Sequence, residues 1–493
     1  MSADVRIRSG REIACLALVA FVGLALSPTV LLGQEAAAQE QAGAEKEQAE
    51  AEKELPPRGG RPRDFRIPAK ETFRLDNGLE VTMVPYGAVP KVNVQLVVRT
   101  GDIDEAADEV WLASLAGDLM QEGTATRSSE QLARDVASMG GQLSINVGAD
   151  RTFVSTEVLS DFGQDAVALI ADVARNAALP EGELERLKAD RLRQLSIQRS
   201  QAQPIALEEF RRRMYPEHPY GRVFPTDEML QAYTLDQVRG FYERNFGAVR
   251  SHLYVSGQFD GAEMREAIRA AFSGWEPGTP AVENIPEPTV GRAIYLIDRP
   301  GAPQSTIYMG LPVPDPSDDE YVPQLVTNSL LGGSFSSRIT RNIREDKGYT
   351  YSPRSQLSTR YRDGYWLQTA DVTTAVTGAA LEEIFSEIDR LQREPPPEEE
   401  LRGIQNFLAG IFVLQNSSRS AIIGQLAFLD LHGLSDEYLI GYVNRIYSVT
   451  PEEVQRIALE YLRDEDMLLV VVGDQSQIAD QLAGFGEVTE VAP

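Results

Sequence analysis

The stretch TLDQVRGFYERNFGAVRSHLYVSG, residues 234–257, returns in related form near the end of the chain. Residues 450–473 read TPEEVQRIALEYLRDEDMLLVVVG, an offset of 216 residues (450 − 234). Each stretch begins with a threonine and a helical pattern of apolar residues, and each ends in an apolar strand and a glycine. Self-similarity at a fixed offset is the signature of a duplicated structural unit.

A second pair of similar segments supports the duplication. Val89-Pro90-Lys91 matches Ala302-Pro303-Gln304 at an offset of 213 (303 − 90). Each copy reads as strands, helices, strands, helices and a closing strand, which predicts an α+β fold with helices covering a mainly antiparallel sheet. We therefore expect an N-terminal domain over residues 65–276, a proline-rich linker over 277–290 and a C-terminal domain over 291–485.

The first 38 residues have the pattern of a secretory signal peptide. Arginines precede an apolar run from Ile13 to Leu26, and Ala36-Ala37-Ala38 follows as a small-residue cleavage site. We therefore expect secretion across the inner membrane and a periplasmic location. An uncleaved anchor stays open, because Ile13 to Leu32 approaches the ~20 residues that a spanning helix needs. Residues 39–64 are acidic and then proline-rich, which predicts a disordered tether.

The composition excludes several classes of partner and site. A chain of 493 residues is too long for a single ordinary hydrophobic core, so we expect more than one domain. The 74 acidic residues outnumber the 47 basic ones and give a net charge of −27, which argues against nucleic acid as a partner. The only cysteine, Cys15, lies in the expected signal peptide. The only histidines, His218, His252 and His432, are never at metal-ligand spacing, and we expect ordinary turn or surface residues.

Two expected helices carry few groups that bind metals. Residues 111–120, WLASLAGDLM, have apolar residues at helical spacing. Ser114 and Asp118 are four apart and therefore share a face of this helix. A second helix is expected over residues 180–195 and has Gln194 near its end. A hydroxyl, one carboxylate and an amide are a poor ligand set for a dication.

The second copy contains a glycine-rich segment, LLGGSFSSRI (330–339), followed by NIREDKGYTYS (342–352). Arg344 and Tyr351 are seven residues apart in it. A guanidinium forks onto a peptide carbonyl or carboxylate, and a phenol can donate to an oxyanion. The alternative is structural: a helix-capping arginine and a half-buried tyrosine. In the first copy, GGQLSINVGAD (140–150) predicts a turn and a strand.

These segments resemble the insulinase family, also called the pitrilysin or mitochondrial processing peptidase family. In that family the first helix carries His-x-x-Glu-His, which binds zinc and supplies a general base. The motif positions match Ser114, Gly117 and Asp118. The further glutamate ligand matches Gln194, and another family acid matches Leu187. The resemblance therefore implies a chain that has lost every zinc ligand.

The resemblance covers about residues 65–473. It also implies a fold and a set of positions that contact the substrate. It implies two such domains facing each other across a chamber. The family's arginine and tyrosine, which reach the substrate at the zinc site, match Arg344 and Tyr351. The positions that it implies for peptide binding are those of the glycine turn and of a strand that pairs with the substrate: Gly332, Gly333, Leu143, Ser144, Ile145 and Val147.

The resulting hypothesis is a zinc-free subunit that is inactive alone. It would assemble with a homologous zinc-binding peptidase subunit, as a heterodimer or larger, and act on peptides. Zinc is expected in the partner, with no cofactor or metal in this chain. The first alternative is a purely structural or peptide-binding protein. The second, a hydrolase using Ser114 and Asp118, is disfavoured because no histidine lies nearby in the sequence to activate the serine.

Overall fold

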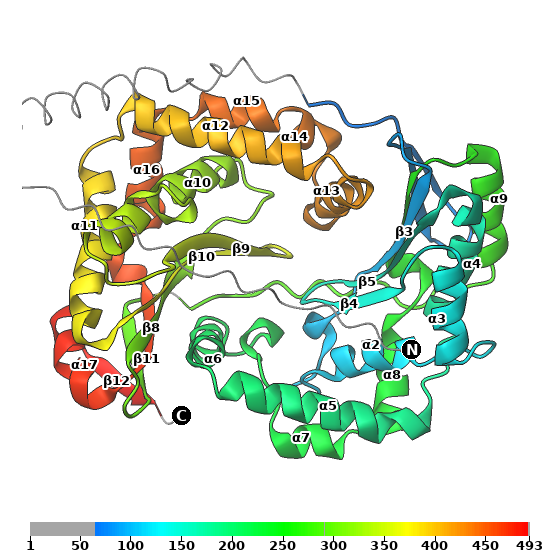
Figure 1. The fold of residues 1–493 in the computed structure, drawn as a ribbon, viewed down its shortest axis with the longest axis horizontal. Coiled ribbons are helices and arrows are strands. Elements are labelled where there is room, and N and C mark those ends of the chain that lie inside the picture. Colours follow the sequence, from blue (N-terminus) through cyan, green and yellow to red (C-terminus); the bar gives the residue numbers. More distant parts are fainter. Residues whose placement is uncertain (1–64, 290, 492–493) are drawn as a thin grey trace, which may run out of the picture. The chain divides into compact units, whose positions relative to one another are not determined.

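Two six-stranded sheets organise the part of the chain that the structure, a computed structural model, describes: residues 65–289 and 291–491 (Figure 1). The expected signal peptide and tether lie outside these residues. Within the described ranges, no helix is both long enough and apolar enough to cross a membrane.

The first sheet has the strand order β1-β2-β6-β3-β5-β4. Its strands are β1 (Glu71–Arg74), β2 (Glu80–Pro85), β3 (Lys91–Val98), β4 (Ser144–Val147), β5 (Thr152–Leu159) and β6 (Ser251–Gly257). The helices of this half are α2 (Leu112–Gln121), α3 (Ser129–Ser138), α4 (Gly163–Arg175), α5 (Glu181–Arg199), α6 (Ala202–Met214), α7 (Asp227–Ala232), α8 (Leu235–Asn245) and α9 (Gly261–Phe272).

The second sheet has the strand order β12-β7-β11-β8-β10-β9. Its strands are β7 (Ala293–Asp298), β8 (Gln304–Pro312), β9 (Arg354–Arg360), β10 (Asp363–Thr373), β11 (Leu468–Gly473) and β12 (Val488–Val491). The helices are α10 (Tyr321–Asn328), α11 (Thr377–Arg393), α12 (Glu398–Gln415), α13 (Arg419–His432), α14 (Asp436–Ile440), α15 (Tyr442–Ser448), α16 (Pro451–Tyr461) and α17 (Gln475–Leu482), with π-helical turns η5 (Ser329–Gly333) and η6 (Thr340–Asp346).

The strand pairing confirms the duplication. Strand β2 is parallel to β6, and β6, β3, β5 and β4 follow in antiparallel pairs. Strand β7 is likewise parallel to β11, and β11, β8, β10 and β9 follow in antiparallel pairs. The expected α+β class with two homologous, mainly antiparallel domains is therefore correct. The copies differ at the outer strand, since β1 is antiparallel to β2 whereas β12 is parallel to β7. Strand β12 also extends the second sheet beyond residue 485, where we expected the domain to end.

The two repeated stretches begin with helix caps. The hydroxyl of Thr234 accepts the N–H of Gln237 at 3.3 Å at the start of α8. The hydroxyl of Thr450 accepts the N–H of Glu453 at 3.2 Å at the start of α16. A threonine in this position satisfies a backbone donor that the first turn of a helix leaves free.

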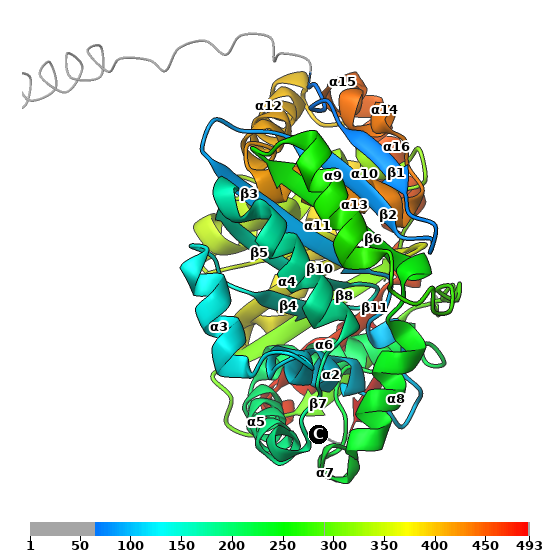
Figure 2. The ribbon, with the colours of Figure 1, turned by 90° about the vertical axis from the view of Figure 1, so that its right-hand side faces the viewer.

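Each half contributes one helix to the sheet of the other half. Helix α6 packs on β8 and β11, and the ring centroid of its Phe210 lies 6.4 Å from that of Tyr308 on β8. Helix α13 packs on β3 and β6, and its Ile423 is buried with Val97 and Tyr254. Helices α4 and α9 lie over the opposite face of the first sheet (Figure 2). The described halves are therefore interlocked through α6 and α13.

The histidines differ from the expectation of ordinary turn or surface residues. His218 begins a turn, but it is only 8% exposed, while His252 and His432 are 9% and 2% exposed. His252 lies in β6 and His432 ends α13, the helix that packs against β6. The surface expectation is wrong because burial here depends on a contact between distant segments, which local sequence patterns do not encode.

Candidate functional site

The positions that match the family's zinc ligands surround an arginine. From α5, Arg191 donates Nε–H to Asp118 Oδ2 at 2.7 Å and Nη2–H to the backbone carbonyl of Ser114 at 3.2 Å. Its Nη1 donates to Gln194 Oε1 at 3.2 Å, and its guanidinium carbon lies 5.9 Å from the Trp111 ring centroid. Arg191 was missed by sequence reasoning, although a position three before Gln194 on a helix lies on the same face.

This arrangement does not fit zinc. The one carboxylate of the set, Asp118, already binds a cation, and Gln194 offers only a neutral amide. A dication at these positions would also be repelled by the Arg191 guanidinium. Two unit charges of like sign 4 Å apart repel each other by about 1 kcal/mol in bulk water and about 4 kcal/mol at an effective dielectric constant of 20. The repulsion between a guanidinium and a dication is about twice as large. The same ion pair engages Asp118, which disfavours a role for this carboxylate beside Ser114 in hydrolysis.

Gly117 allows α2 to approach β4 closely. A Cβ atom at this position would lie 2.7 Å from Val147 Cγ2 and 3.6 Å from Ile145 Cγ2. Both distances follow from the packing of α2 on β4. On α5, Leu187 is buried in the same apolar core. Gly117 and Leu187 therefore both contribute to packing.

A buried carboxylate holds the start of α2. Glu105 Oε1 accepts the N–H of Ala113 at 2.8 Å, and Oε2 accepts the N–H of Trp111 at 3.1 Å. Burial, together with the nearby carboxyl of Asp102, raises the pKa of Glu105 above its usual value. Trp111 itself has a left-handed backbone with φ 70°, a conformation that non-glycine residues rarely adopt. The hydrogen bonds from Trp111 and Ala113 to Glu105 hold this turn at the start of α2.

Strand β4 forms one edge of the first sheet. It contains Ser144, Ile145 and Val147, whereas Leu143 precedes it. Ile145 and Val147 face the apolar core beside α2. An edge strand leaves a row of backbone donors and acceptors unpaired, which is the geometry needed for an added peptide strand.

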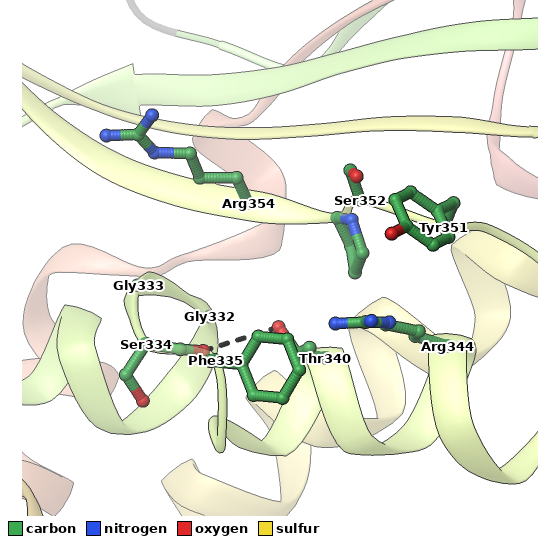
Figure 3. Close-up of a pocket in the computed structure, with 10 residues that line it drawn as sticks. Gly332, Gly333, Ser334, Phe335, Thr340, Arg344, Tyr351, Ser352 and Arg354 are labelled. Atoms are coloured by element: carbon green, nitrogen blue, oxygen red, sulfur yellow. Dashed lines mark hydrogen bonds between the residues drawn. The ribbon is translucent and has the colours of Figure 1, made fainter. Parts of the chain in front are cut away.

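The second copy holds a cavity of about 440 Å³ around the arginine and tyrosine (Figure 3). Its walls come from η5, η6 and the start of β9. The lining residues are Gly332, Gly333, Ser334, Phe335, Thr340, Arg344, Tyr351, Ser352, Pro353 and Arg354. The structure thus gathers the glycine turn and the Arg-Tyr pair into one site.

Arg344 lies between two exposed aromatic rings. Its guanidinium carbon is 4.4 Å from the Phe335 ring centroid and 5.1 Å from that of Tyr351. Phe335 is 68% exposed and Tyr351 is 79% exposed. Among the described residues, no hydrogen bond or ion pair engages the Arg344 guanidinium or the Tyr351 hydroxyl. Figure 3 shows the guanidinium directed into the cavity.

Buried polar contacts hold the helical turns that carry Arg344. Arg338 forks onto Glu400 of α12 with distances of 2.9 and 2.8 Å. The Asn342 amide donates to Glu383 and Glu387 of α11, at 2.9 Å each. Such forked, charge-assisted contacts fix geometry as well as contributing energy. The frame is therefore anchored, while Arg344 itself has no ion-pair partner in the described part of the chain.

The segment after η6 places Tyr351. Gly348 has φ +67°, a left-handed conformation that glycine adopts without strain, and it ends the helical turn. The Thr350 hydroxyl donates to the backbone carbonyl of Asp371 at 2.7 Å, which ties the chain to β10. Tyr351 follows directly and projects outward.

Two family models match the chain. The model described as Insulinase (Peptidase family M16) matches residues 85–225. The model described as Peptidase M16 inactive domain matches residues 232–408. The first match includes α2 and β4, and the second includes the Arg344 cavity.

Individual relatives support the same assignment. An uncharacterized zinc protease of Rickettsia bellii (strain RML369-C) is 24% identical over 336 residues, which cover 67% of this chain and 81% of that protein. Another, from Bacillus subtilis (strain 168), is 23% identical over 406 residues, which cover 81% of this chain and 97% of that protein.

Solved structures share the fold. The peptidase M16 inactive domain from Pseudomonas fluorescens has a TM-score of 0.76 at 23% identity and covers 82% of this chain and 98% of its own. A protease from Helicobacter pylori also has a TM-score of 0.76, at 18% identity, and covers 83% of this chain and 100% of its own.

Proposed function

Because this chain belongs to the insulinase family of peptidases, family M16, we propose that it is a zinc-free subunit that completes the active site of a zinc-binding homologue. In this proposal it supplies Arg344 and Tyr351 to the partner and has no peptidase activity alone. The observation that carries it is a contrast. The matched ligand positions are occupied by the Arg191 ion pair. By contrast, the half-buried Arg344 and the exposed Tyr351 make no hydrogen bond or ion pair within the described residues and lie on an anchored frame.

The two side chains suit complementary tasks. Arg344 can fork onto a substrate carbonyl or terminal carboxylate, which positions the peptide. Tyr351 can donate a hydrogen bond to the oxygen that gains charge as the peptide carbonyl is attacked. Activation of water is assigned to the zinc of the partner, because neither a guanidinium nor a phenol supplies it.

Peptides are the proposed substrates, and the periplasm is the proposed location. The free edge of β4 supports peptide binding, since an extended chain can pair with it and place alternate side chains against the α2 side. The relatives from Rickettsia bellii and Bacillus subtilis, which are described as uncharacterized zinc proteases, support the same class of substrate. The periplasmic location rests on the signal-peptide pattern of the first 38 residues.

The test is kinetic and uses the complex purified from the native source. Tyr351→Phe should leave assembly and KM nearly unchanged and lower kcat by roughly 10²- to 10³-fold, the usual effect of removing one such donor. Arg344→Ala should act mainly on KM, because a grip on the substrate backbone serves ground and transition states alike.

Matched controls lie on the same chain. Arg341→Ala changes another arginine of η6, and Tyr447→Phe changes a tyrosine of α15 that contacts Asn406. Both should retain activity. Full activity in a complex that carries both Arg344→Ala and Tyr351→Phe would overturn the proposal and favour a purely structural or peptide-binding role. Peptidase activity of the isolated chain would also contradict it.

A further inference from the structure

A group of potential metal ligands lies where α13 packs against the first sheet. Glu80 of β2 and His252 of β6 are paired neighbours in that sheet. Asp430 comes from α13, and the ligand atoms of the three residues all lie within 4.8 Å of one another. None of the three residues contributes to the former zinc positions or to the Arg344 cavity.

The imidazole of His252 is held with Nδ1 toward the two carboxylates. Its Nε2 lies 2.9 Å from Thr82 Oγ1, which lies 3.0 Å from Thr72 Oγ1. A proton on Nε2 is thus donated into a chain of hydroxyls. The ring also stacks on Tyr254 with centroids 4.0 Å apart. With its proton on Nε2, the neutral imidazole would present the Nδ1 lone pair to a metal between the two carboxylates.

Two of the distances between ligand atoms suit a metal ion. Nδ1 of His252 is 3.3 Å from Asp430 Oδ2 and 3.6 Å from Glu80 Oε2. Metal–ligand bonds of about 2.0–2.2 Å separate neighbouring ligand atoms by about 2.8–3.6 Å in octahedral or tetrahedral coordination. Arg74 binds the other oxygen of Glu80, Oε1, so that Oε2 remains directed at His252. The Tyr254 hydroxyl, 3.1 Å from Nδ1, adds a further oxygen beside the group.

We propose that Glu80, His252 and Asp430 bind one divalent transition-metal ion, with water completing its coordination. One imidazole and two carboxylates suit Zn²⁺ and also Co²⁺ or Mn²⁺. The ligands come from the first sheet and from a helix of the second half, so the ion ties these segments together. Binding stabilises the folded chain by mass action. The site departs from the expectation of a metal-free chain, and it stands independently of the proposed function.

The test uses the whole chain after chelator treatment. Cobalt is titrated by visible absorption and zinc by calorimetry, and each should saturate at one equivalent. Asp430→Asn should lower the affinity at least about 10-fold, and His252→Gln should lower it further, because each removes one protein ligand. Asp430 is exposed, so its variant tests the proposal even if His252→Gln folds poorly.

Asp118→Asn is the matched control, since it removes the one carboxylate of the former zinc positions. This variant should bind as the unaltered chain does. Excess zinc should raise the Tm of both by about 2 °C or more and raise the Tm of Asp430→Asn by clearly less at the same zinc concentration. The proposal is overturned if the unaltered chain shows no saturable binding, or if Asp118→Asn abolishes binding while Asp430→Asn keeps it.

Discussion

Arg191 explains how two helices that resemble metal-binding ones remain associated without metal ligands. Its guanidinium connects Asp118, Gln194 and the backbone of Ser114, which are otherwise separate points on α2 and α5. A guanidinium carries a permanent charge in a planar fork, so it can hold a carboxylate and a carbonyl at the same time. The ion pair has thus become part of the packing between α2 and α5.

Arg191→Met should lower the free energy of unfolding by about 1–2 kcal/mol, because the partly buried Asp118 loses its charged partner while the apolar stem is retained. Urea denaturation measures this change. Arg193→Met on the same helix, whose arginine is exposed, should cost less than about 0.5 kcal/mol. Equal effects of the two changes would show that the Arg191 contacts contribute little.

His432 should make the chain sensitive to acid. Burial lowers its pKa to about 4 from an ordinary 6.5, against the opposing effect of Asp315. The unfolded chain therefore binds the proton first, so this residue's contribution to stability is lost as pH falls from about 6.5 to about 4. The free energy of unfolding should therefore fall between about pH 7 and pH 4, and in His432→Met this fall should be smaller by about 1–3 kcal/mol. Unfolding free energies measured at the two pH values give the comparison. An identical pH dependence in both proteins would contradict this prediction.

Helix α2 and strand β4 are each recognisable from local patterns, but their contact is set by Gly117. A helix-interior glycine costs roughly 0.5–1 kcal/mol relative to alanine. It is retained here because a Cβ atom would overlap Val147, a β-branched side chain with few alternative rotamers. The local cost is offset by close packing of the helix on the edge strand.

Gly117→Ala should therefore destabilise the chain by about 1–2 kcal/mol through overpacking. In a Val147→Ala background the same change should become neutral or stabilising, because the overlapping methyl group is gone. A double-mutant cycle of unfolding free energies measures this coupling. Gly410→Ala in α12, where nothing lies within 4 Å of the added Cβ, should stabilise by about 0.5–1 kcal/mol. An equal cost in both backgrounds would exclude the overlap as the cause.

The two halves of the described chain share their cores. Helix α6 contributes Phe210 to the second sheet, and α13 contributes Ile423 to the first. Polar contacts accompany this exchange: Tyr215 donates to Asp363 at 2.6 Å, and Arg419 forks onto Glu157 at 3.1 and 3.2 Å. Because each sheet lacks part of its cover without the other half, the halves should unfold together.

Tyr215→Phe should lower the free energy of unfolding by about 1–3 kcal/mol, because the buried carboxyl of Asp363 loses its donor. Calorimetry and urea denaturation should still show one transition for both halves. Tyr447→Phe, which removes an exposed contact to Asn406, should change little. Two separate transitions in the unaltered chain would contradict the shared core.

Local patterns predicted a large share of this protein. The caps at Thr234 and Thr450, the apolar strands and the fixed offset predicted two α+β copies, which the sheet orders confirm. The segment from Gly332 to Tyr351 predicted a candidate site, and the structure gathers its two glycines, Arg344 and Tyr351 around one cavity. These features are readable because their interacting residues lie within a few turns or strands of each other in the sequence.

The tertiary structure alone decided which faces meet. Arg191 reaches Asp118 from 73 residues away, and His252 meets Asp430 across 178 residues. The packing of α13 on β6 buries His252 and His432, which were expected to be ordinary turn or surface residues. Helical and strand periodicity encodes which side of an element is apolar, but not which distant element covers it. That choice depends on the shape and charge complementarity of complete surfaces, which exist only once the chain has folded.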